Sequence, residues 1–262
     1  MSAPAGPARG LLRSLRIAIR FLSRLPLPGD HDATEAELAR SVGWHPTVGL
    51  VVGGLLAMAS GLLAWTSLAV EPRAALLTVL SVLITGGLHE DGLADATDGL
   101  GAGKGPVRAL AIMRDSRVGA FGGLALVSVL LLRYAALVGT DGAAWAGALI
   151  TSYVAARVVG PVMLFLFVYA RPGEDGLAQP LIAGLQPRHV LAAIASAAAL
   201  LLLSGGFGAL LLLPLAIAAA VLLGGLCQRS VSGITGDLVG ASIALTELVG
   251  LLLWAGTSPA AA

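Results

Sequence analysis

The sequence predicts an all-α, polytopic integral membrane protein with about seven transmembrane helices and an amphipathic helix near the N-terminus. Of its 262 residues, 57% are hydrophobic and only 12% are charged, whereas soluble domains carry roughly 25% charged residues. The mean hydropathy is +0.90. Apolar runs of about 20 residues, the length that crosses a bilayer, recur along the chain. No linker divides it, so residues 1–262 are expected to form one membrane-embedded domain.

The first 43 residues combine apolar residues at helical spacing with arginines between them. The apolar positions are Leu11, Leu12, Leu15, Ile19 and Leu22. This pattern is typical of a basic amphipathic helix on an anionic membrane surface, which makes membrane lipid an expected partner. A solvated surface helix is the alternative. Because arginines interrupt the apolar run, the segment does not resemble a signal peptide.

The rest of the chain alternates between apolar runs and polar connections. We expect transmembrane spans at residues 44–69, 73–88, 119–138, 144–169, 190–205, 207–226 and 239–256. The longer polar connections between them are residues 89–118, 170–189 and 227–238. The 35 glycines suit close helix packing in lipid.

The basic residues predict the orientation. All but three of the 16 Lys and Arg residues lie in residues 1–43 or in the three polar connections. The exceptions are Arg73, Arg133 and Arg157, the last two inside spans. Because positively charged segments stay in the cytoplasm, we expect the N-terminus and the polar connections there and the C-terminus outside. The localisation would be the cell inner membrane.

The stretch "GGLHEDGLADATDGLGAGK", residues 86–104, concentrates acidic residues directly after an apolar run. Asp91, Asp95 and Asp98 are spaced i, i+4, i+7 and would share one helix stripe. Three like charges repel, so a cation should offset them. Oxygen ligands favour Mg²⁺, with Mn²⁺ as the second choice. A solvated acidic helix end is the alternative, and the neighbouring His89 and Glu90 would point elsewhere.

The stretch "RALAIMRDSRVGAFGG", residues 108–123, supplies cations beside these carboxylates. Arg114 and Arg117 flank Asp115, a further candidate site residue. Arginine forks bind phosphate oxygens, and a metal beside them neutralises a transferring phosphoryl group. Residues 89–118 are therefore interpreted as a cytoplasmic catalytic segment for phosphoryl transfer.

Ionisable residues also lie inside the predicted spans, where burial is costly and function is the default hypothesis. In "SGITGDLVGASIALTELVG", Asp237 precedes the last span and Glu247 lies ten residues further on. Arg157 is a candidate for phosphate binding or for pairing with an acid. Arg133 is interpreted as extending toward the far interface. The less informative residues are His31, His45 and His189, read as interfacial or loop residues, and Cys227, read as a small apolar residue.

Four blocks in this order carry a resemblance to a known family. They are "FLSRLPLP" (21–28), "GGLHEDGLADATDG", "IMRDSRVGAFGGLAL" and "GITGDLVGASIALTEL". Together they resemble the adenosylcobinamide-GDP ribazoletransferases, the cobalamin synthases, from about residue 21 to residue 253. The resemblance implies transfer of the cobinamide-phosphate moiety of adenosylcobinamide-GDP to a ribose hydroxyl of α-ribazole or its phosphate. GMP would leave, and Mg²⁺ would be required.

The resemblance also implies roles for the residues that match these blocks. Asp91, Asp95 and Asp98 would bind Mg²⁺, and one of them would take the hydroxyl proton. Arg114 and Arg117 would hold phosphates. Asp237 would complete the metal shell or act as base, and Glu247 would orient another group. His89 is a candidate ligand or proton acceptor, and Glu90 is a weaker one because the family often has an apolar residue there.

Two other functions stay open. A CDP-alcohol phosphotransferase of lipid synthesis would carry D-x-x-D-G-x-x-A-R, but here "DGLADATDG" lacks the Arg and the second aspartate pair. A cation-coupled transporter would place its charges near the bilayer midplane, which only Arg157 and Glu247 favour. The net charge of +1 argues against a nucleic-acid partner. The oligomeric state is left open, with a homo-oligomer among the alternatives.

Overall fold

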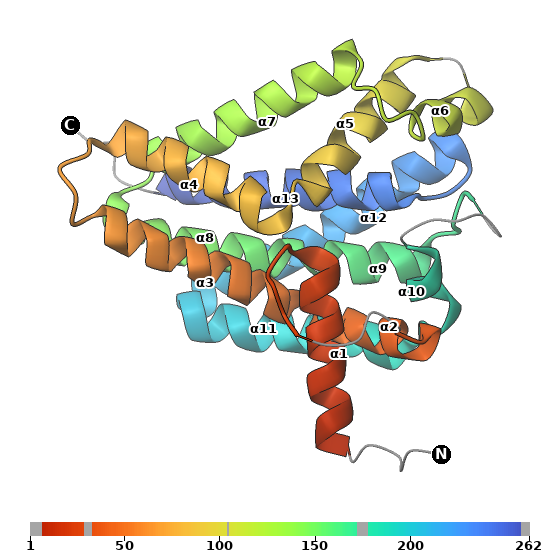
Figure 1. Ribbon diagram of the computed structural model, residues 1–262, viewed down its shortest axis with the longest axis horizontal. Coiled ribbons are helices and arrows are strands. Elements are labelled where there is room, and N and C mark those ends of the chain that lie inside the picture. The colour runs from red at the N-terminus through yellow and green to blue at the C-terminus, as the bar shows by residue number, and fades with distance from the viewer. Residues whose placement is uncertain (1–6, 29–32, 104, 172–177, 258–262) are drawn as a thin grey trace.

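The computed structural model describes residues 7–28, 33–103, 105–171 and 178–257, which form helices and no named strand (Figure 1). The α-helices are α1 (Pro7–Leu22), α2 (Glu35–Ser41), α3 (His45–Leu63), α4 (Val70–Thr85), α5 (Leu88–Gly101), α6 (Pro106–Ile112), α7 (Ala120–Val138), α8 (Trp145–Ala156), α9 (Val159–Leu166), α10 (Gln179–Ala183), α11 (Pro187–Leu210), α12 (Leu212–Val231) and α13 (Gly236–Thr257). Two short 3₁₀ turns are η1 (Val42–Trp44) and η2 (Gly142–Ala144). The all-α prediction is confirmed.

Six helical stretches within the described residues are long and apolar enough to cross a membrane. They are Glu35–Leu63, Ala120–Val138, Gly142–Leu166, Pro187–Leu210, Leu212–Val231 and Gly236–Thr257. Helices α4 and α5 give a seventh only as a pair, because they meet at an angle of 89°. The prediction of about seven spans therefore holds as six to seven, and the chain is a multi-pass membrane protein.

The bend between α4 and α5 depends on two consecutive glycines. Gly86 and Gly87 have φ angles of 68° and 70°, a left-handed conformation that other residues adopt at a cost. The predicted span 73–88 thus ends as α4 at Thr85, and the acidic motif starts a separate helix in a new direction. The predicted span 144–169 also divides, into α8 and α9, at Arg157 and Val158.

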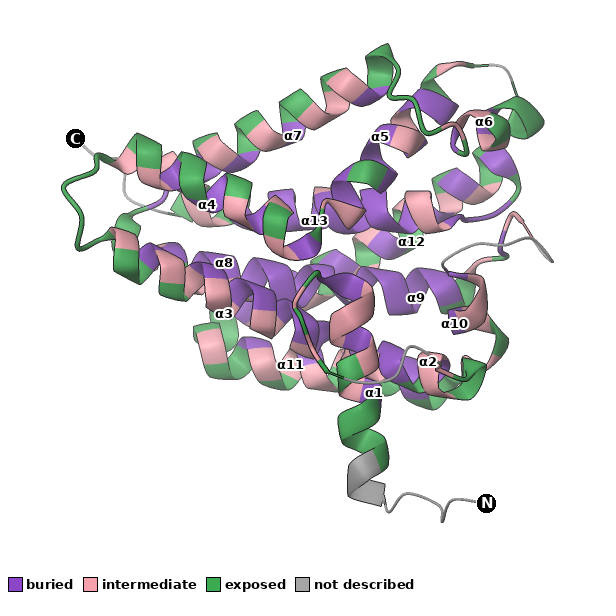
Figure 2. Ribbon diagram, viewed as in Figure 1, coloured by how far each residue is buried: buried purple, intermediate pink, exposed green. Residues whose placement is uncertain are grey.

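The stretch formed by η2, α8 and α9 is the central one. Of its span window, 83% is buried, against 22–28% for α7, α11 and α12. Helix α8 packs against α3, α13 and α11. The outer helices expose large apolar side chains such as Leu131, Leu203 and Leu222, and Figure 2 shows exposed stretches along α7 and α11. This is the expected surface toward lipid, because lipid does not penalise exposed leucine.

The close contact between α3 and α8 gives a test of this packing. A Cβ at Gly49 would lie 2.4 Å from the carbonyl oxygen of Tyr153, whereas a Cβ at Gly54 meets nothing within 4 Å. We expect Gly49→Ala to destabilise the protein by about 1–3 kcal/mol because the helices must separate. Gly54→Ala on the same helix is the matched control. Thermal unfolding in detergent should show a lower transition only for Gly49→Ala, and equal transitions would contradict this packing.

The polar connections gather at one end of the helix bundle. Figure 1 shows α6, α10 and the α12–α13 turn at the same end, opposite the α3–α4 and α7–α8 turns. Helix α1 crosses the direction of the long helices and contacts α2 and α3. The amphipathic helix predicted near the N-terminus is therefore present, and its Leu11 and Leu12 are more than half exposed.

Candidate functional site

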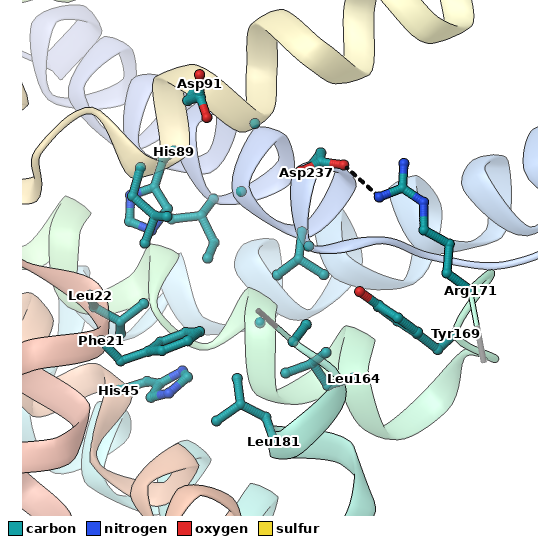
Figure 3. A pocket seen from close by; sticks show the side chains of 18 residues that line it. Phe21, Leu22, His45, His89, Asp91, Leu164, Tyr169, Arg171, Leu181 and Asp237 are labelled. Atoms are coloured by element: carbon teal, nitrogen blue, oxygen red, sulfur yellow. Dashed lines mark hydrogen bonds and ion pairs between the residues drawn. The ribbon is translucent and has the colours of Figure 1, made fainter. Parts of the chain in front are cut away.

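A pocket of about 200 Å³ lies where the ends of α1, α3, α5, α9, α10 and α13 meet (Figure 3). Its polar lining residues are His45, His89, Asp91, Tyr169, Arg171 and Asp237. Apolar side chains such as Phe21, Leu164 and Leu181 form the remaining wall. The stretches 21–28, 86–104 and "GITGD" thus each contribute residues to the pocket lining. Residues 114–117, which we call the "RDSR" block, contribute none.

The acidic stripe is arranged as its spacing predicted, on one helix. Helix α5 carries Asp91, Asp95 and Asp98, which are exposed, partly buried and buried in that order. Asp91 alone of the three lines the pocket. Asp95 interacts electrostatically with Asp91, Asp98 and Asp237, so carboxylates from two distant blocks converge.

A glycine allows this convergence. A Cβ at Gly92 would lie 2.8 Å from the carbonyl oxygen of Asp237, so the backbones of α5 and α13 are in direct contact there. Thr235 fixes the start of α13, because its hydroxyl accepts a hydrogen bond from the Leu238 N–H at 3.2 Å and donates one to Asp237 Oδ2 at 3.3 Å. The carboxylate of Asp237 is therefore held beside the acidic stripe.

Asp98 has partners that the sequence did not reveal. Its two carboxylate oxygens accept hydrogen bonds from the N–H groups of Gly119 at 2.6 Å and Gly122 at 2.9 Å. These N–H groups lie at the start of α7, where the backbone N–H groups of a helix have no acceptor within the helix itself. A Cβ at Gly119 or Gly122 would lie within about 2.5 Å of the same carboxylate. Asp98 therefore joins α5 to the start of α7, and its metal role stays a prediction.

The donor chemistry of Asp91, Asp95 and Asp237 fits a hard divalent cation, which prefers carboxylate oxygens. Arg171 is the cation found against Asp237, with 3.5 Å between Nη1 and Oδ2. Within the described residues, however, no group of three or more His, Cys, Asp or Glu side chains is gathered closely enough to hold a metal ion. The Mg²⁺ site consequently stays a prediction.

Arg171 is the pocket cation that sequence reasoning missed. Its Nη2 donates a hydrogen bond to the Leu110 carbonyl at 3.0 Å. A short backbone bridge places it, because Ala170 N–H donates to Ile234 O and Ile234 N–H donates to Val168 O, both at 2.8 Å. The sequence showed Arg171 only as a basic residue in a polar connection. It could not show that Arg171 enters the pocket, because the bridge that places it joins segments over sixty residues apart.

The residues of the "RDSR" block lie outside the pocket lining. Arg117 is exposed and forms a bidentate pair with Asp115, whose pKa this bond lowers to about 2. Arg114 is also exposed and interacts electrostatically with Tyr169, a pocket residue whose pKa burial raises. Phosphate binding by Arg114 and Arg117 stays a prediction, and Arg117 would have to leave its pair with Asp115 to make it.

Four charged residues form a buried cluster next to the pocket. Arg133 donates to Glu90 Oε1 and, at 2.7 Å, to Glu247 Oε2, and Arg157 donates to Glu247 Oε1. All four side chains are at least nine-tenths buried. The interpretation of Arg133 as reaching the far interface is wrong, because the carboxylates of α5 and α13 hold it inside. Arg157 does pair with an acid, and it does not line the pocket.

Two histidines that were interpreted as interfacial or loop residues, His45 and His189, are buried in helices. His45 is buried and lines the pocket, so its interpretation as an interfacial or loop residue is wrong. His189 is buried in the first turn of α11, while His31 lies outside the described residues. His89 lines the pocket 4.0 Å from Glu247. Within the part of the chain that the structure describes, no ring nitrogen of His45 or His89 has a hydrogen-bond partner, and both rings line the pocket.

Comparison with known proteins identifies similar chains. The family described as Cobalamin-5-phosphate synthase matches residues 14–255. The chain is 38% identical over 253 residues to an adenosylcobinamide-GDP ribazoletransferase of Mesorhizobium japonicum, covering 94% of this chain and 93% of the relative. It is 39% identical over 238 residues to the enzyme of the same name in Ectopseudomonas mendocina, covering 90% and 96%. No solved structure matches.

Proposed function

This chain belongs to the cobalamin-5-phosphate synthase family, and we propose that it joins adenosylcobinamide-GDP to α-ribazole or α-ribazole phosphate in the pocket between α5 and α13. This is the final joining step of cobalamin biosynthesis, and it makes the chain a transferase. The observation that carries the location is the convergence of Asp91, Asp237 and Arg171 on one pocket. A guanidinium binds phosphate oxygens directly, and carboxylates suit a pyrophosphate substrate when they hold a divalent metal ion.

The proposed reaction is a phosphoryl transfer. The new bond joins the ribose hydroxyl oxygen to the phosphorus that carries cobinamide. The broken bond joins this phosphorus to the oxygen bridging the diphosphate, and that oxygen leaves with GMP. A pocket carboxylate, Asp91 or Asp237, accepts the hydroxyl proton.

The proposed binding roles follow from position and charge. Arg171 holds a phosphate of the diphosphate from beside Asp237. Asp91, Asp95 and Asp237 would hold Mg²⁺ or Mn²⁺, which when bound neutralises phosphate charge. Asp98 is the fourth candidate ligand. His45 and His89 offer unpartnered ring nitrogens to the substrates.

The size of the pocket limits what it can enclose. At about 200 Å³ it is smaller than the roughly 300–1,000 Å³ typical of sites that enclose drug-sized ligands. A corrinoid therefore stays outside, with only its phosphate-bearing end inserted beside Asp91 and Arg171.

We further propose that the protein lies in the cell inner membrane and that its pocket faces the cytoplasm. The three polar connections contain 7 of the 16 Lys and Arg residues, whereas the α3–α4 and α7–α8 turns at the opposite end contain none. This asymmetry supports a cytoplasmic position.

The proposed activity is tested on purified protein reconstituted in lipid and on matched lipid without it. We expect metal-dependent release of GMP together with a cobalamin product from adenosylcobinamide-GDP and α-ribazole. Folded protein that releases no GMP here but transfers phosphoalcohols from CDP-alcohols would contradict the proposal and favour lipid synthesis.

Metal removal should have a separate and measurable effect. We expect EDTA to abolish GMP release, because Arg171 would then be the one guanidinium among the pocket-lining residues left to offset the diphosphate charge, and excess Mg²⁺ or Mn²⁺ to restore it. Mn²⁺ binding, followed by electron paramagnetic resonance without substrate, gives a second readout. Full activity in EDTA, or equal Mn²⁺ binding by wild type and a D91N/D95N variant, would contradict the metal assignment.

A further inference from the structure

A second hollow, which we call the basic groove, lies between α1, α2 and α11. It has a volume of about 810 Å³ and shares no lining residue with the pocket. Its charged walls are Arg13, Glu37, Arg40 and Arg188, and its floor includes small residues such as Ala192. None of these residues is required by the proposed reaction.

The charges of the basic groove form one connected group. Arg13 Nε lies 2.9 Å from Glu37 Oε1, and Arg40 also interacts electrostatically with Glu37. Arg40 and Arg188 both interact with His189. With three guanidinium groups and one carboxylate among its lining residues, the groove has a net positive charge, and planar arginine forks suit phosphate oxygens.

An apolar surface adjoins these charges. Leu11, on the α1 wall, is 58% exposed, and Leu191, on α11 beside the groove residue Ala192, is 64% exposed. Helix α11 is long and apolar enough to cross the membrane, and only 22% of its span window is buried. Trp44, which also lines the groove, is of the residue type enriched at membrane interfaces. The ligand that matches this surface has an anionic head and apolar chains.

We propose that the basic groove binds one anionic phospholipid, with its phosphate between Arg40 and Arg188 and its acyl chains along the exposed side of α11. A water-soluble phosphate compound would use the arginines but gain nothing from the leucines. The anionic surface of a cytoplasmic leaflet would supply the ligand at high local concentration.

The test measures bound lipid without substrates, so its result does not depend on the proposed function. Protein in neutral detergent is supplied with phosphatidylglycerol or phosphatidylcholine, and retained lipid is counted by native mass spectrometry. We expect one phosphatidylglycerol per protein, retained in preference to phosphatidylcholine. An R40Q/R188Q variant should bind it about 25-fold more weakly, roughly fivefold per arginine. Both side chains are exposed, so the variant should fold, as its thermal transition will show.

An R16Q/R229Q variant is the matched control, because it removes two exposed arginines outside the groove. It should keep wild-type retention. Equal loss in the two variants would assign binding to general surface charge and overturn the proposal. So would unchanged retention in R40Q/R188Q, or displacement of the lipid by millimolar inorganic phosphate, which would identify free phosphate as the ligand.

Discussion

Replacing Asp91 by Asn should reduce the transfer activity by about 100-fold or more while leaving the folded protein intact. Asp91 is exposed and lines the pocket, so its charge serves no buried partner. Removing a carboxylate that binds a metal or accepts a proton typically costs two to four orders of magnitude in rate. GMP release and thermal unfolding of the same preparation measure the two effects.

Asp98→Asn is the matched control, because the same substitution is made on the same helix. Asp98 accepts hydrogen bonds from two N–H groups of α7, and an amide can accept only with one of its two terminal atoms. We expect this variant to lose about 1–3 kcal/mol of stability. Near-normal activity of Asp91→Asn would remove the central role assigned to that carboxylate, and an equal loss of stability in both variants would remove the distinction between them.

The fold could be predicted largely from apolar run length, because membrane helices must bury their polar backbone within themselves. The span predicted at 119–138 agrees with α7 to within one residue. The break at Arg157 was missed because apolar residues continue through it. The Gly86–Gly87 bend was missed because paired glycines also suit helix packing in lipid, and only the positive φ angles distinguish the two uses.

The site was predictable where its chemistry is local and unpredictable where it depends on distant contacts. The aspartate spacing on α5 is a property of one helix, and it was read correctly from the sequence. Arg171 enters the pocket through a bridge between residues 168–170 and Ile234, for which no sequence pattern exists. His45 is similar, since only the packing of α3 against its neighbours makes it a pocket residue.

Replacing Glu247 by Gln should be among the most destabilising single changes in the described residues. Glu247 is the carboxylate shared by Arg133 and Arg157, and all three side chains are almost completely buried. Without that charge, Arg157 has no acidic partner among the described residues, and breaking a buried ion pair typically costs about 3–5 kcal/mol. Thermal unfolding in detergent should show a large decrease, while Glu71→Gln, at an exposed acid on α4, should show none.

A compensating variant separates charge pairing from packing. R157M/E247L removes one cation and one anion together and leaves the pair of Arg133 and Glu90 in place. Replacing a buried pair by apolar residues is often neutral, so this variant should regain much of the lost stability. If it is as unstable as E247Q, packing rather than ion pairing explains the loss. Because the cluster connects α5, α7 and α13 beside the pocket, recovered stability would show that the balance of buried charge, rather than packing at Glu247, stabilises this junction.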